Sequence, residues 1–202
     1  RLAISFPEIT EMQTEAIVLA TAKLLKEGLS PTPEIMIPLV GSIGEFLNQK
    51  QIIESTIQKS NISKNINIKI GTMIELPRAC FIADEIAKHA DFISFGTNDL
   101  TQTTFGFSRD DIGSFLPHYI ENNIIKRDPF QTLDTNGVGE LIKIAIKKSK
   151  TTNPNIKIGV CGEHGGDPES IKFLVGAGVH YVSCSPFRIP IAGLTLAQTG
   201  KK

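Results

Sequence analysis

Cysteine is scarce in this sequence, and no sign of charge dominates it. Three widely spaced cysteines, an odd number, argue against a disulfide framework and favour a reducing compartment, so we expect a cytoplasmic protein. The formal net charge is +0, which gives no electrostatic case for binding nucleic acid or an anionic membrane. No apolar run approaches the roughly 20 residues of a membrane helix, and no signal-peptide pattern opens the chain.

Several short motifs that mark enzyme classes are also missing. The chain has no CxxC, no HExxH, no P-loop and no Ser-His-Asp order. These absences argue against a dithiol oxidoreductase, a zinc protease, a nucleotide-binding P-loop and a serine hydrolase. Any chemistry must therefore be found in residues that gather by folding rather than in one of these patterns.

The composition is otherwise that of an ordinary globular domain. The 202 residues are 41% hydrophobic and 21% charged, which is enough for one well-buried domain covering residues 1–202. The chain starts with Arg1 instead of Met, so we expect it to be a piece of a longer protein.

Apolar strand patterns alternate with helical patterns along the chain. A capping box of Ser42 and Glu45 predicts the start of one helix, and Asp167-Pro168 predicts the start of another. A polar turn is expected at 60–65, and a long loop at 100–137. The expected strands are 34–40, 68–75, 92–99, 158–161 and 181–186, and the expected helices are 10–25, 43–57, 77–90, 138–148 and 168–177.

Strands that are apolar along their whole length and separated by helices indicate a parallel sheet covered on both faces. About five such strands are expected. An open doubly wound sheet and a (β/α)₈ TIM barrel both fit this pattern, and both place function at the carboxyl ends of the strands. A complete barrel needs eight strands and about 250 residues, so a barrel here would lack its first strands.

Glu75 and Asp99 end neighbouring expected strands. The carboxyl ends of parallel strands share one rim, so the two carboxylates should lie close together, and a carboxylate pair suits Mg²⁺. The alternative is that Asp99 or Asn98 only caps a turn while Glu75 lies in a surface loop. Position alone leaves the metal site and this alternative equally open.

Anion-binding groups follow in the same region. The turn from Gly96 to Asp99 offers backbone N–H groups and the Asn98 amide to a phosphate or carboxylate. Arg109 can fold back as a bidentate anion clamp. Its alternative, which the sequence favours, is a solvated loop arginine paired with Asp110 or Asp111.

Cys161 ends an expected strand and is followed by a glycine-rich turn. A thiol in this position is a candidate nucleophile or general acid/base, and its role depends on its pKa. Cys80 and Cys184 are expected in the core. We interpret His164 as a hydrogen-bonding group in preference to the primary base.

Several long segments resemble the C-terminal part of the pyruvate, phosphate dikinases, in order and across essentially the whole chain. The segments are IGTMIELPRA, FISFGTNDLTQTTFGFSRDD, FLPHYIENNIIKRDPF, NGVGELI, VCGEHGGDPESI and HYVSCSPFRIPIA. The GTND and Cys-Gly-Glu motifs are shared with the wider phosphoenolpyruvate (PEP)-utilising enzymes, which include PEP synthase and enzyme I of the sugar phosphotransferase system. CGEHGG and SCSPFRIPIA look like the dikinases in particular.

The resemblance implies the last five or so βα units of a (β/α)₈ barrel that binds PEP and pyruvate. It assigns Mg²⁺ to Glu75 and Asp99, substrate contacts to Gly96, Thr97, Asn98 and Asp99, and the general acid/base role to Cys161. The match of Arg109 to an anion-binding arginine of enzyme I is looser. The reaction implied is ATP + pyruvate + phosphate to AMP + PEP + diphosphate.

The same resemblance implies parts that residues 1–202 do not contain. These are the early barrel strands with their phosphate-binding arginines, a phosphohistidine domain and a nucleotide-binding domain, which would be partners of this segment. We expect a homo-oligomer, because an incomplete barrel leaves two open strand edges. The alternatives are an inactive piece, a binding or oligomerisation module, or membership of the PEP synthase or enzyme I groups.

Overall fold

The computed structural model describes residues 1–60 and 67–200 of the chain. Five parallel strands form one sheet in the order β1-β2-β3-β4-β5, which is also their order along the chain. The strands are β1 (Glu34–Ile37), β2 (Lys69–Ile74), β3 (Phe92–Gly96), β4 (Lys157–Cys161) and β5 (Tyr181–Val182). Neighbours in sequence are therefore neighbours in the sheet, as in an arc of a (β/α)₈ barrel, and the expected parallel α/β fold is confirmed.

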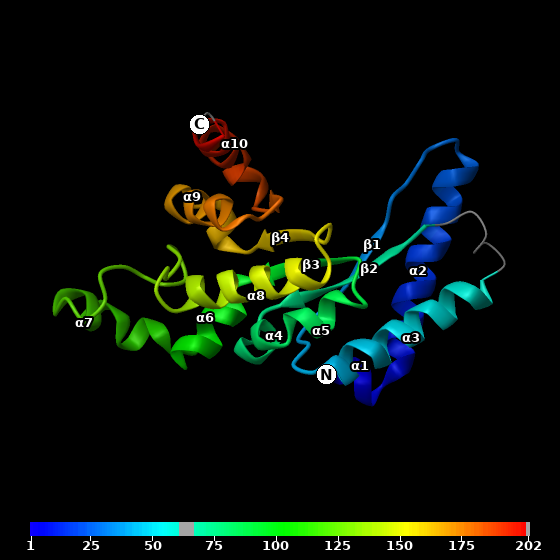
Figure 1. Cartoon of the computed structure of the whole chain (residues 1–202), viewed down its shortest axis with the longest axis horizontal. Helices are drawn as coiled ribbons and strands as arrows, with labels where there is room; N and C mark the ends of the chain where they lie inside the picture. Colours follow the sequence, from blue (N-terminus) through cyan, green and yellow to red (C-terminus); the bar gives the residue numbers. More distant parts are fainter. Residues whose placement is uncertain (61–66, 201–202) are drawn as a thin grey trace.

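Helices connect the strands (Figure 1). Helices α1 (Leu2–Ser5) and α2 (Pro7–Lys26) precede β1, and α3 (Ile43–Lys59) lies between β1 and β2. Between β2 and β4 lie α4 (Pro77–Phe81), α5 (Ala83–Ala87), α6 (Thr97–Phe105), η2 (Ile112–Ser114), α7 (Leu116–Glu121) and α8 (Val138–Thr152). After β4 come η3 (Glu163–Gly166), α9 (Pro168–Ala177), η4 (Pro186–Arg188) and α10 (Ile189–Thr199). In the view of Figure 1, α4, α5 and α8 lie below the strands while α9 and α10 lie above them.

The core lies between the sheet and these helices. Alternate strand residues such as Ile74, Phe95 and Ile158 are fully buried against Ala83 and Ile142. Residues one position along each strand face the opposite side, because successive side chains alternate. That side is the concave, inner face of the arc, and it leads to the strand ends where the candidate site lies.

Helix starts follow the expected chemistry. Ser42 and Glu45 form the predicted capping box, and Asp167 accepts a hydrogen bond from the Ser170 N–H at the start of α9. Gly178 ends α9 in the left-handed conformation, with φ of 97°. The capping patterns in the sequence therefore predicted both helix starts to within one residue.

Several expected boundaries are wrong. The strand expected over 92–99 ends at Gly96, and residues 97–105 form α6, so Asn98 and Asp99 lie in a helix's first turn. The strand expected over 34–40 ends at Ile37, where Leu39 takes a φ of 53°. The helix expected over 77–90 divides into α4 and α5.

The last part of the chain also differs from the expectation. The strand expected over 181–186 is only the two residues of β5, and α10 was not expected at all. Helix α10 and the residues before it expose apolar side chains, with Phe187 93% and Leu194 62% exposed. Of the expected turn at 60–65, Ser60 ends α3, and 61–65 lie outside the described residues.

Candidate active site

Glu75 follows β2 and is only 3% exposed. Its Oε1 accepts a hydrogen bond of 2.6 Å from the Leu39 N–H, in the turn after β1. On the other side the carboxylate lies over Gly96, where a Cβ atom would come within 2.6 Å of Oε2. Two neighbouring strand ends therefore hold Glu75 inward, and the interpretation of it as a surface-loop residue is wrong.

Asp99, in the first turn of α6, faces Glu75. Burial raises the pKa of Glu75, and the nearby Asp99 carboxylate raises it further, while the Leu39 N–H opposes the shift. Helix α6 has no side-chain cap, so Asp99 does not serve as the capping residue of the alternative interpretation. The structure thus brings the two predicted carboxylates together.

Two like-charged carboxylates in a buried site suit a cation. Among residues 1–60 and 67–200, no group of three or more His, Cys, Asp and Glu side chains gathers as a potential metal site. A hard cation that takes few protein ligands and fills its remaining positions with water and substrate oxygens is the kind that fits this pair. The donor set therefore fits Mg²⁺ better than a transition metal that prefers nitrogen or sulfur.

Cys161 ends β4 directly beside Gly96 of β3. Its thiol donates to the Phe95 carbonyl oxygen over 3.5 Å. Burial raises the pKa of Cys161, the Ser94 hydroxyl opposes this, and the negative charge of Glu75 raises it again. The thiol therefore stays protonated at neutral pH, within electrostatic reach of the carboxylate pair.

His164 and Thr97 connect three segments beneath the site. Both are fully buried. The Thr97 hydroxyl lies 2.7 Å from His164 Nδ1 and 3.1 Å from the Cys161 carbonyl oxygen, and His164 Nε2 lies 2.9 Å from the Pro129 carbonyl oxygen. A carbonyl oxygen only accepts, so Nε2 carries the proton.

Burial lowers the pKa of His164, although the Pro129 carbonyl and nearby carboxylates act in the opposite direction. The imidazole is therefore neutral, and its unprotonated Nδ1 lies against the Thr97 hydroxyl. Both ring nitrogens are engaged inside the protein, which agrees with a hydrogen-bonding role and leaves no base for a substrate.

Asn98 lies between the carboxylates and the loop after β4. Its Oδ1 is buried without a hydrogen-bond partner among the described residues, which is unusual for a buried polar atom. Gly162, with φ of 104°, approaches so closely that a Cβ atom there would lie 3.2 Å from Oδ1. The amide is thus held at the site with hydrogen-bonding capacity to spare.

Arg109 folds back toward the site, but its partner is not the one expected. Its Nη2 lies 3.7 Å from Glu163 Oε1, and its guanidinium lies 5.9 Å from the centre of the Phe130 ring. The structure records no ion pair of Arg109 with Asp110 or Asp111 among the described residues. Glu163 is two residues from Cys161, so Arg109 lies at the edge of the candidate site.

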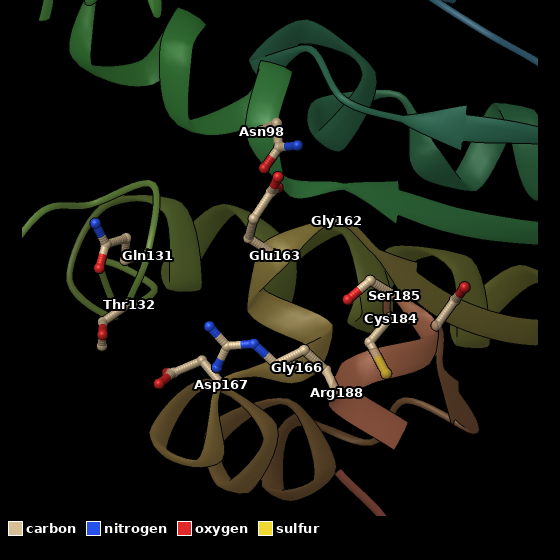
Figure 2. A pocket seen from close by; sticks show the side chains of 11 residues that line it. Asn98, Gln131, Thr132, Gly162, Glu163, Gly166, Asp167, Cys184, Ser185 and Arg188 are labelled. Atoms are coloured by element: carbon tan, nitrogen blue, oxygen red, sulfur yellow. The ribbon is translucent and has the colours of Figure 1, made fainter. Parts of the chain in front are cut away.

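A cavity of about 440 Å³ adjoins this site. It touches the site at Asn98 and Gly162 and extends between η3 and η4, while Glu75, Asp99 and Cys161 do not line it (Figure 2). The sequence did not predict that the other lining residues would come together. These residues are Gln131, Thr132, Glu163, Gly166, Asp167, Ser183, Cys184, Ser185 and Arg188.

Two cysteine interpretations can be compared with the structure. Cys80 is fully buried in the core, as expected, and burial raises its pKa to about 12. Cys184 is only partly buried and lines the cavity, so its expected core position is wrong. Cys184 belongs to the SCSPFR stretch. This stretch was the sequence feature that could have indicated the cavity wall formed by residues 183–188.

Comparisons with known proteins agree on one kind of relative. A family model described as PEP-utilising enzyme, PEP-binding domain, matches residues 1–200. Pyruvate, phosphate dikinase 1, chloroplastic, of Arabidopsis thaliana is 55% identical over 200 residues, and pyruvate, phosphate dikinase 2 of Zea mays is 53% identical. Each alignment covers 98% of this chain but only 21% and 23% of the relative, respectively, so the chain spans about a fifth of their length.

A crystal structure supports the fold. A citrate lyase from Burkholderia xenovorans superposes with a TM-score of 0.54 at 13% identity, covering 82% of this chain and 49% of that one. At this identity the likeness concerns the fold alone. Among the described residues, no helix is both long and apolar enough to cross a membrane.

Proposed function

Since the chain belongs to the family of PEP-utilising enzymes, matched over residues 1–200 by the model of their PEP-binding domain, we propose that it forms the PEP- and pyruvate-binding part of a pyruvate, phosphate dikinase. Residues 1–202 would be the C-terminal part of the barrel domain. The early barrel strands, the phosphohistidine domain and the nucleotide-binding domain would lie in the rest of the protein. The relatives' greater length supports this division.

Glu75 and Asp99 would hold Mg²⁺. When bound, this ion supplies positive charge to the enolate that forms as PEP loses its phosphoryl group. The buried position of Glu75 supports this role. The negative charges of Glu75 and Asp99 repel each other, and a bound cation would remove that repulsion. Gly96, Thr97 and Asn98 would position the substrate, and Arg109 would draw its anionic groups toward the strand ends.

Cys161 would act as the general acid/base. Its protonated thiol gives a proton to the methylene carbon of the enolate to form pyruvate, and in the reverse direction the thiolate removes that proton. The raised pKa of the thiol favours the acid form that the first direction needs. The position of this thiol, at the end of β4 directly beside Gly96 and near the buried Glu75, is the observation that carries the proposal.

The test is proton exchange in the intact protein. The Cys161→Ala variant should lose exchange of the pyruvate methyl protons into D₂O, measured by NMR, while ATP-dependent phosphorylation of the histidine domain continues. Cys80→Ala, which removes a buried thiol with a pKa of about 12, serves as the control and should keep the exchange. Undiminished exchange in Cys161→Ala would refute the assignment.

A second candidate is an association module. The sheet has open edges at β1 and β5, and apolar side chains are exposed at Phe187 of η4 and Leu194 of α10. Such edges and apolar faces favour pairing with further chain, so homo-oligomerisation remains our expectation. Light scattering over a wide concentration range tests it, and a monomer throughout would count against it.

Cytoplasmic location also stays a prediction, since the Arabidopsis relative is named as chloroplastic.

A further inference from the structure

We propose that the cavity between η3 and η4 is an oxyanion-binding site for a phosphate-class ligand, with Arg188 as its cation. This site is separate from Glu75, Asp99 and Cys161, and it does not depend on their proposed roles. Most of its walls come from the two stretches that look most like the dikinases, CGEHGG and SCSPFR, in which the proposed enolate chemistry uses only Cys161. The cavity therefore gives a purpose to residues that the enolate chemistry leaves unused.

Two consecutive glycines bring these stretches together. A Cβ atom at Gly165 would lie 2.2 Å from the Ser183 carbonyl oxygen, and one at Gly166 would lie 2.9 Å from the Cβ atom of Arg188. Both contacts are closer than a side chain permits. Gly165 thus lets the end of β5 pack on η3, while Gly166 provides the surface on which the stem of Arg188 lies.

Three charged side chains line the cavity, and they are Arg188, Glu163 and Asp167. Arg188 is the only cationic side chain among the described residues that line it, and it has no ion pair in the described part of the chain. Both acidic side chains already have partners. Asp167 accepts from the N–H and hydroxyl of Ser170 over 2.9 and 2.5 Å, and Glu163 pairs with Arg109.

Neutral hydrogen-bonding groups complete the site. Figure 2 shows the Arg188 guanidinium extending toward Asp167, with Ser185 and Cys184 on one side of it and Thr132 and Gln131 on the other. Hydroxyl and amide donors beside an unpaired guanidinium are the groups that bind phosphate oxygens in proteins. A cavity of about 440 Å³ has room for phosphate with ordered water, or for a phosphoryl group carried by a small molecule.

Cys184 provides a local readout in the intact protein, because its thiol lines the cavity. We would measure the alkylation rate of Cys184 by peptide mass spectrometry while titrating inorganic phosphate. Phosphate should slow alkylation of Cys184 in a saturable way. In Arg188→Ala the phosphate concentration for half-protection should rise at least about tenfold, and Arg188→Lys should restore part of it.

Two further variants sharpen the test. Gly166→Ala should weaken protection, because it displaces the stem of Arg188. Arg127→Ala removes another exposed arginine, one that pairs with Glu169 outside this cavity, and should leave protection unchanged. Because Arg188 is exposed, its replacement should not unfold the protein, which circular dichroism verifies.

Separate titrations identify the source of the oxyanion. Protection by PEP as well as by phosphate, both lost in Arg188→Ala, would assign the site to a phosphoryl group on either carrier, whereas protection by phosphate alone would assign it to the free ion. Absence of protection by both, or equal protection in Arg188→Ala, would overturn the proposal. Cys161→Ala should still show protection by phosphate, so failure of the acid/base assignment is distinguishable from failure of this one.

Discussion

Lys157 of β4 reaches Glu34 of β1 across two intervening strands, with 3.1 Å between Nζ and Oε1. Strands in a flat sheet lie about 4.8 Å apart, so these two would be separated by roughly 14 Å of backbone. The contact is favoured because the sheet curves and side chains on its concave face converge. The aromatic ring of Tyr181, with its centre 4.9 Å from the Lys157 ammonium, extends this cluster to β5.

A double-mutant cycle of Glu34→Ala and Lys157→Ala in the 202-residue chain should give a coupling free energy of about 0.5 kcal/mol in urea unfolding. The value is small because both side chains are partly exposed, at 32% and 46%, and it should fall as salt is added. The Glu140–Lys143 pair on α8 provides a cycle without cross-sheet contact. Additive single effects would mean that the cross-sheet pair does not stabilise the curvature.

Gly96→Ala should destabilise the chain by about 1–3 kcal/mol, because the new methyl group would meet Met73 Sδ at 2.5 Å and the Glu75 carboxylate. Gly113→Ala is the matched control, since nothing lies within 4 Å of a Cβ atom there. Urea unfolding measures both. Equal stability of the two variants would show that Glu75 can move aside at no cost.

Asp99→Asn and Glu75→Gln should each weaken divalent-cation binding by at least about tenfold, because each removes one of two carboxylate ligands. Electron paramagnetic resonance of Mn²⁺, used in place of Mg²⁺, measures the free ion directly. Asp111→Asn, in the exposed loop after α6, controls for general loss of negative charge. Unchanged Mn²⁺ affinity in Asp99→Asn would exclude the proposed metal site.

Cys80 and Cys161 should differ in their alkylation by iodoacetamide at pH 8. Cys80, with a pKa of about 12 and no exposed surface, has only about one thiolate in ten thousand and should react only on unfolding. Cys161 should react slowly, with a rate that keeps rising above the usual titration range of a thiol, because its pKa is raised. Labelling of Cys80 in the folded protein at the rate of Cys161 would contradict this order.

His164 should make the chain less stable in acid. Burial lowers its folded-state pKa, so below about pH 6.5 the unfolded chain binds a proton that the folded chain does not. Its contribution is therefore fully present above the unfolded pKa and is lost as the pH falls toward the folded pKa, with a slope of at most about 1.4 kcal/mol per pH unit.

His164→Gln keeps a donor for the Pro129 carbonyl and removes the titration, so its unfolding free energy should depend less on pH between 5 and 7 than that of the unmodified chain. His118→Gln replaces an exposed ring on α7 and is the control. If the pH profiles of the chain and His164→Gln were parallel, other groups would account for the acid sensitivity.

Local chemistry made much of the fold predictable. Alternating apolar strands and helices predicted about five parallel strands, and the caps at Ser42 and Asp167 predicted two helix starts. The boundary at Gly96 was missed because 97–99 follow an apolar strand without any side-chain cap. Helix α10 was missed because Pro190 and Gly193 disfavour a helix by propensity, although Pro lies in its first turn.

The site was predictable only in part. The resemblance and the shared rim brought Glu75, Asp99 and Cys161 together in advance, although their roles remain proposals. The cavity wall around Arg188 was not predicted, because it depends on how closely the ends of β4 and β5 approach each other. Gly165 and Gly166 make that approach possible, and a sequence shows their presence without showing what packs against them.

The contacts of the long segment after α6 also suggest where new sequence could be inserted. Residues 128–133 are anchored to the protein: the Pro129 carbonyl accepts from His164, and the Leu133 N–H donates to the Ser170 hydroxyl over 2.9 Å. Residues 122–126 are mostly exposed and lie between α7 and this anchor. A peptide tag or fluorescent reporter grafted there would leave the anchored turn in place, so the segment is suited to carrying a reporter of events at the strand ends.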